Sequence, residues 1–244
     1  TATIAGLSIE GDLTFDSAIV LQGAAAGSIS SVNGQLRGDN AGASLTNVDN
    51  TLSGHGLLEV RVLSNQSGGR IVGFDFSAST VNNAGTITES VVEATKLTNT
   101  GTIANSVLFV PYSGGIDNGK TGIITNATFG STIVNNRGLI QSDGSGSKQT
   151  LLSGTEILGG ELATSNGGVI EVRRFDDHIT ALSPDKIAAG TRFSILPGAV
   201  AQLSNVSAFP MVLDNVSIAI SGAGDRTTLF LDGYPMILQG GSKI

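Results

Sequence analysis

The chain has 244 residues, a net charge of −7 and a hydrophobic content of 40%, enough for one large domain or two ordinary ones with a substantial core. Only 14% of the residues are charged and 34 are glycine, and the apolar residues are mostly Ile, Val, Leu and Ala, a balance typical of β-rich, turn-rich proteins. The acidic balance argues against nucleic acid as a partner, the absence of cysteine removes disulfides and thiolate chemistry, and no apolar run approaches the roughly 20 residues of a membrane span.

The first residues, Thr1 to Ile4, alternate as a strand does, and no signal-peptide pattern precedes them. Further along, Arg37-Gly38-Asp39 lies in GQLRGDNAG, for which the glycines and Asn predict a turn-like loop. This tripeptide is an integrin-recognition sequence in many adhesive proteins, so it is a candidate receptor motif; the alternative is a plain surface turn.

A short cassette recurs through the middle of the chain: an Asn, a turn that contains Gly, and a β-branched run. It is found at residues 83–87, 99–103, 118–124, 136–140 and 166–170. The glycines before each run, Gly85, Gly101, Gly122, Gly138 and Gly168, are 16, 21, 16 and 30 residues apart. A constant motif at irregular spacing predicts the coils of one solenoid with loops of different length, and the last gap predicts an extra or elongated coil.

Each cassette has a physical interpretation. We expect residues such as Val81 and Leu97 to point inward, the Asn-X-Gly to form a tight turn with positive φ, and the following Ile to begin the next strand. Stacked coils place equivalent residues above one another, so the side-chain amides of Asn47, Asn83, Asn99 and Asn136 are predicted to form a hydrogen-bonded ladder. The expected role of these asparagines is structural.

The predicted fold class is all-β, a right-handed parallel β-helix with irregular coils of about 16–25 residues. Residues 190–224 alternate in the same style and residues 228–244 read as one more coil, whereas residues 183–189 predict a loop or a short helical turn. A β-sandwich is the alternative, but it offers no reason for the recurring cassette. We expect a single solenoid domain over residues 1–244, as a fragment or protomer of a longer repeat array.

The segments LTNVDNTLSGHGLL (45–58), VNNAGTI (81–87), LTNTGTI (97–103), LGGELATSNGGVIEV (158–172) and TLFLDGYPMILQGGSKI (228–244) carry a resemblance. They resemble the repeats of giant bacterial secreted β-helix proteins, the filamentous-haemagglutinin-like and autotransporter passenger families. The resemblance covers residues 40–175 well and the flanks loosely. It implies an extracellular or cell-surface location and a stalk used in adhesion, matrix or cell contact, with a host-surface or matrix glycan or protein as ligand.

Candidate catalytic groups do not form a site in the sequence. Gly54-His55-Gly56, Arg70 and Asp176-Asp177 resemble pieces of a polygalacturonase site, but the Asp pair follows the His by about 120 residues, several coils away. We therefore predict no catalytic residue, no cofactor and no metal site. The alternative is a β-helix that binds or degrades polysaccharide.

The predicted function is structural: a stalk or fibre segment of a secreted bacterial β-solenoid, for surface adhesion, matrix or filament formation. A solenoid end without a cap exposes strand edges and open core. Since neither end of this sequence carries an obvious cap, we expect head-to-tail self-association, with the coil around Met236, Ile237 and Leu238 pairing with the first coil of another copy.

Overall fold

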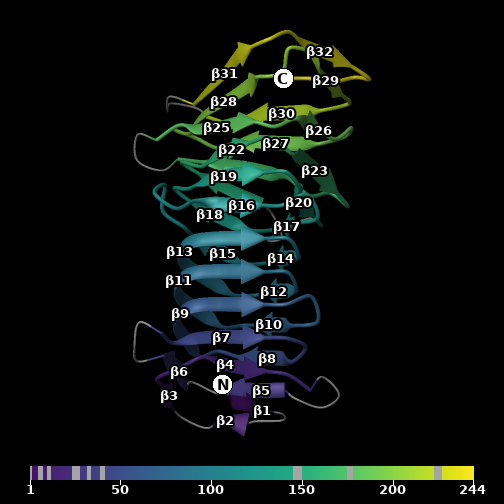
Figure 1. The fold of residues 1–244 in the computed structure, drawn as a ribbon. Helices are drawn as coiled ribbons and strands as arrows, with labels where there is room; N and C mark the ends of the chain where they lie inside the picture. The colour runs from purple at the N-terminus through teal and green to yellow at the C-terminus, as the bar shows by residue number, and fades with distance from the viewer. Residues whose placement is uncertain are drawn as a thin grey trace. The chain divides into compact units, whose positions relative to one another are not determined.

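The computed structural model describes residues 2–4, 8–9, 12–23, 28–31, 34–38, 42–144, 150–174, 178–222 and 227–244. Within these ranges all regular structure is β-strand, without a helix (Figure 1). The chain forms two compact units, Thr1–Gly115 and Ile116–Ile244. Every strand pairing found within either unit is parallel, so the predicted parallel β-solenoid is confirmed, and the β-sandwich, which is built of antiparallel sheets, is excluded. The single domain stays a prediction.

In the first unit the chain visits three faces in turn, and each strand pairs with the strand one coil later on the same face. Face 1 holds β3 (Leu13–Phe15), β6 (Gln35–Gly38), the first halves of β9 (Leu57–Asn65), β11 (Asp75–Asn83) and β13 (Val91–Asn99), and β15 (Val107–Phe109). Face 2 holds β1 (Ala2–Ile4), β4 (Ile19–Leu21), β7 (Ser44–Asn47) and the second halves of β9, β11 and β13. Face 3 holds β2 (Ser8–Ile9), β5 (Ser28–Ser31), β8 (Thr51–Gly54), β10 (Arg70–Val72), β12 (Thr86–Thr88) and β14 (Thr102–Ala104).

The second unit has the same three-face order. Face 1 holds β18 (Thr128–Gly130), β21 (Thr150–Ser153), β24 (Ile170–Arg173), β27 (Arg192–Ile195) and β30 (Ser217–Ile220). Face 2 holds β16 (Ile116–Asn118), β19 (Ile133–Asn136), β22 (Glu156–Leu158), β25 (Thr180–Ser183), β28 (Val200–Asn205) and β31 (Thr228–Gly233). Face 3 holds β17 (Ile123–Thr125), β20 (Leu139–Asp143), β23 (Glu161–Ser165) and β26 (Lys186–Ile187), followed along the chain by the pair β29 (Met211–Asp214) and β32 (Met236–Gln239).

The core of each unit consists of columns of aliphatic side chains, because the side chains of a strand alternate between the inside and the outside. Val81 and Leu97, both expected to point inward, are fully buried and adjacent in one column. In the first unit the columns are Leu58, Phe76, Val92 and Leu108 on face 1, Leu45, Leu63, Val81 and Leu97 on face 2, and Leu52, Ile71, Ile87 and Ile103 on face 3. Each coil is therefore stabilised by the coils on either side of it.

Coil length varies more than the sequence predicts. One coil takes 16 residues from Asn83 to Asn99, and another takes 28 from Leu203 to Leu231. The cassette at residues 166–170 is also in a different phase: Ile170 pairs with Thr150 and Phe193 on face 1, whereas the runs of the other four cassettes lie on face 3. The expected extra or elongated coil between Gly138 and Gly168 is therefore wrong, because the equivalent of Gly138 one coil later is Gly160.

The cassette glycines do not adopt the positive φ that the sequence predicts. Gly85, Gly101 and Gly138 are absent from the positive-φ residues. Instead, they are required by close packing of the backbones, because a Cβ on Gly101 would overlap the carbonyl oxygen of Gly85, and a Cβ on Gly85 would overlap that of Gly69. A side chain at these positions would push successive coils apart.

Positive φ occurs at a different corner, where face 3 leads into face 1. Gly73, Glu89 and Asn105 occupy this corner in three successive coils, with φ of 79°, 54° and 51°. Gly and Asn tolerate this left-handed conformation, whereas it strains a Glu backbone. The short segment 183–189, expected as a loop or helical turn, contains strand β26 instead.

We predict that Glu89→Gly increases the free energy of unfolding by about 0.5–1 kcal/mol, because glycine removes the strain of a left-handed Glu at the cost of some backbone entropy. Urea denaturation measures the change as a shift of the midpoint at constant slope. Glu93→Gly, in an extended part of β13, is the control and should destabilise. An equal loss in both variants would contradict this account of the corner.

Candidate functional site

Asparagine side chains form a continuous hydrogen-bonded ladder at the end of face 2 in the first unit. The Nδ2 of each Asn donates to the Oδ1 of the Asn one coil later: Asn47 to Asn65 at 2.9 Å, Asn65 to Asn83 at 2.8 Å, and Asn83 to Asn99 at 2.8 Å. All four side chains are buried. Asn47, Asn83 and Asn99 were predicted from the sequence, whereas Asn65 was missed.

Each ladder amide also closes its own turn. The Nδ2 of Asn47 donates to the carbonyl oxygen of Asn50 at 2.9 Å, and that of Asn83 donates to Gly85 at 3.3 Å. Buried amides are costly unless they are hydrogen-bonded, and here the same side chain satisfies a neighbouring coil and the turn. The ladder therefore fixes both the turn and the register of the stack.

The second unit contains a shorter run. Asn118 donates to the Oδ1 of Asn136 at 2.7 Å, and Asn136 donates to the carbonyl oxygen of Gly159 at 3.3 Å. Asn136, which the sequence placed with the other three, thus belongs to the second unit, and its partner Asn118 was missed. The next coil has Gly159 and Gly160 at the turn, where a Cβ on Gly160 would overlap the Asn136 amide.

The Arg37-Gly38-Asp39 motif is not the turn that the sequence predicts. Arg37 and Gly38 belong to strand β6, and Asp39 lies outside the described residues. The Arg37 guanidinium is half-exposed and forms an ion pair with Glu59 of the next coil at 3.3 Å. Receptor binding by this motif stays a prediction.

The residues that suggested an enzyme do not assemble a recognisable site in the part of the chain that the structure describes. His55 is an exposed turn residue, and Arg70 is exposed on β10. Asp176 and Asp177 lie outside the described residues. Among the residues described, no group of three or more His, Cys, Asp or Glu side chains is arranged to hold a metal ion, and no helix could cross a membrane. That the protein is not an enzyme stays a prediction.

A groove of about 360 Å³ opens on the outside of the first unit beside the ladder. Three successive coils line it in the same way, each with the residue before its ladder Asn and the residue after it. These lining residues are Ser64 and Gln66, Asn82 and Ala84, and Thr98 and Thr100; Ser67, Asn65 and Asn83 complete the lining. The volume lies within the range of ligand-binding sites, and the lining carries no charged side chain.

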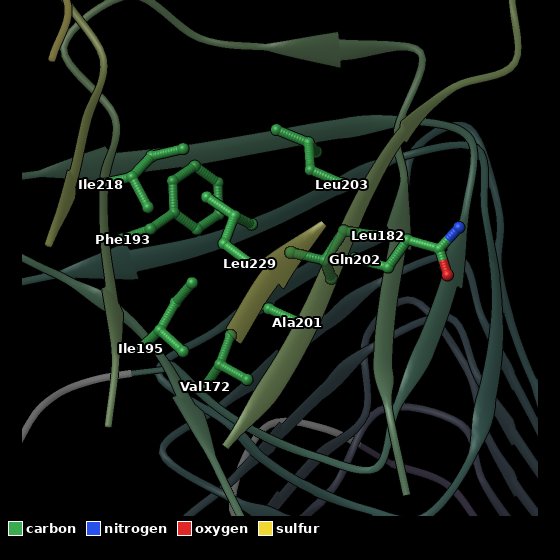
Figure 2. A pocket seen from close by; sticks show the side chains of 9 residues that line it. All are labelled: Val172, Leu182, Phe193, Ile195, Ala201, Gln202, Leu203, Ile218 and Leu229. Carbon is green, nitrogen blue, oxygen red and sulfur yellow. The ribbon is translucent and has the colours of Figure 1, made fainter. Parts of the chain in front are cut away.

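The inside of the second unit offers only a small gap. Figure 2 shows it between the inward side chains of its later coils, among them Val172, Phe193 and Leu203. The gap has a volume of about 10 Å³, at the lower limit for a single water, and an almost wholly apolar lining. It is a packing defect and too small for a ligand.

The last described coil leaves core-facing side chains uncovered. Ile220, Leu231 and Leu238 are 46%, 51% and 51% exposed, whereas their register partners one coil earlier, Ile195, Leu203 and Leu213, are 1%, 2% and 1% exposed. Three inward positions on three different strands are thus open together. We call this surface the open coil end.

Comparison with models of protein families, with curated proteins and with solved structures found no match for this chain. The resemblance to secreted β-helix proteins is therefore supported by the parallel solenoid and by the repeat segments alone.

We predict that Asn83→Leu lowers the free energy of unfolding by about 2–3 kcal/mol, because it leaves the Asn65 amide without its acceptor and the Gly85 carbonyl without its donor. Asn82→Leu, at the next residue but with an exposed side chain, is the matched control and should change stability by less than about 0.5 kcal/mol. Thermal or urea unfolding compares the two. Equal stability of both variants would refute a stabilising ladder.

Proposed function

We propose that this chain is a structural segment of a secreted bacterial β-solenoid, which acts as a stalk or fibre element in surface adhesion, matrix or filament formation. The observation that carries the proposal is the open coil end. The extracellular location rests on the resemblance of segments such as LTNVDNTLSGHGLL and LTNTGTI to repeats of secreted adhesins.

The interior of the coils suits a load-bearing role. Within each unit, three parallel sheets connect every coil to the next, and buried aliphatic columns fill the space between the sheets. The Asn ladder adds side-chain hydrogen bonds in the same direction. Bending such a stack would break several interactions at each coil, so the arrangement favours stiffness.

The open coil end favours a further coil stacked upon it. Burial of a half-exposed Leu or Ile contributes about 1 kcal/mol, so covering Ile220, Leu231 and Leu238 offers a substantial driving force. Strands β30, β31 and β32 pair along one edge with β27, β28 and β29. Their other edges have no strand partner in the described part of the chain, so backbone donors and acceptors are available for pairing.

The occupant that fits this end is the first coil of a second copy. Strands β1, β2 and β3 pair with β4, β5 and β6, and within the described residues no strand pairs with their opposite edges. Stacking these edges on β31, β32 and β30 continues all three faces with parallel strands, whereas two open coil ends facing each other would run antiparallel. Such a head-to-tail contact does not close, so it propagates into fibres.

We predict that the purified chain forms filaments whose length increases with concentration, and that Leu238→Lys abolishes them by placing a charge in the stacking core. Negative-stain microscopy and light scattering measure the length distribution. Ile237→Lys is the matched control, because its register partner Val212 is exposed and the side chain therefore faces outward.

A monodisperse wild-type chain at millimolar concentration would reject self-association and leave the role of a stalk segment within a longer chain. Equal loss of filaments in both Lys variants would show that the association does not depend on the open core. Far-ultraviolet circular dichroism of each variant verifies that the coils remain folded.

A further inference from the structure

We infer that the outer groove of the first unit is a binding site for a neutral, hydroxyl-rich polysaccharide chain that runs across successive coils. The groove is lined by Ser64, Gln66, Ser67, Asn82 and Thr98 among others. It belongs to a single copy of the chain, so the inference is independent of fibre formation.

The groove residues form a periodic array. Ser64, Asn82 and Thr98 occupy the same register position on β9, β11 and β13, directly before the ladder asparagines. Adjacent strands of a sheet lie about 4.8 Å apart, so one polar group recurs at that interval. A linear polymer with hydroxyl groups along its length can bond to several coils at once.

The polar groups of the array are available for a ligand. The side chains of Ser64, Asn82 and Thr98 make no hydrogen bond to the described chain, although ladder side chains directly beside them are fully bonded. Amide and hydroxyl groups donate and accept hydrogen bonds, as sugar hydroxyls do. The array therefore complements a glycan better than it complements an anion or an apolar ligand.

The equivalent positions in the second unit are used differently. Asp117, before ladder residue Asn118, accepts a bidentate ion pair from Arg137, which follows ladder residue Asn136, at 2.8 and 3.1 Å. Charged side chains there satisfy each other across a coil. The uncharged and unpaired lining is thus a property of the first unit and not of the cassette in general.

The groove contains no aromatic side chain for a sugar to stack on. Each site is therefore weak, and hydrogen bonds supply the affinity. Neutrality gives selectivity, since an acidic glycan would lose hydration of its carboxylates without gaining a cationic partner.

Nuclear magnetic resonance titration of the full chain with linear neutral hexasaccharides of glucose, mannose and galactose tests the inference. We expect at least one of the three to bind, with millimolar Kd and shift changes at Ser64, Asn82 and Thr98. The double variant Ser64→Ala/Asn82→Ala should weaken binding at least about fivefold, the effect of roughly one lost hydrogen bond. Asn135→Ala, the equivalent exposed Asn of the second unit, should bind as the wild type does.

Three results would overturn the inference: no binding of any of the three sugars at 10-fold the expected Kd of about 1 mM, shift changes centred on residues outside the groove, or equal binding of a galacturonate hexasaccharide. Filament formation by the double variant at wild-type level would show that loss of sugar binding and loss of assembly are separate effects.

Discussion

Register between successive coils is the constraint on which the rest of this structure depends. Parallel, in-register stacking places each residue directly against its equivalents one coil before and after, so every position repeats the same environment. Inward positions become columns of Leu, Ile and Val, and the turn position becomes a column of Asn. The glycines obey the same constraint, since a Cβ on Gly101 would collide with the backbone of the preceding coil. Core, ladder and turn are therefore one solution to one packing problem.

The ladder shows how the fold buries polar groups without a net penalty. A single buried Asn needs partners for two donors and one acceptor, and an isolated coil cannot supply them. In the stack, Asn65 accepts from Asn47, donates to Asn83, and donates again to the carbonyl oxygen of Gly69. Where the ladder ends beyond Asn136, Gly159 and Gly160 take the turn instead, and backbone carbonyls replace the missing side chain. Specific hydrogen bonding thus holds the register that the aliphatic columns alone would fix only loosely.

The sequence predicted the features that repeat and missed those that do not. The cassettes indicated parallel coils, inward Val81 and Leu97, and a ladder position, because stacking forces identical residues into identical places. Asn65 escaped notice since its turn, Gln66 to Gly69, is longer than Asn-X-Gly and conceals the motif. The cassette at 166–170 misled for the converse reason: Asn and Gly suit a tight turn at any corner, so the local pattern carries no information about the face it leads to. Coil phase depends on long-range pairing, which a local motif does not encode.

The two proposed activities use different sides of the same strands. Side chains alternate along a strand, so the outward Asn82 lines the groove while Asn83, the next residue, holds the ladder inside. Growth by stacking requires only strand edges and core-facing residues, and it leaves the outer groove unoccupied. Each added copy would therefore present another groove in the same fibre. Weak sites held at fixed spacing bind a long polysaccharide with an avidity well above that of one site, since the second contact becomes intramolecular once the first has formed. A groove without aromatic platforms is thus adequate for adhesion when the protein that carries it is a polymer.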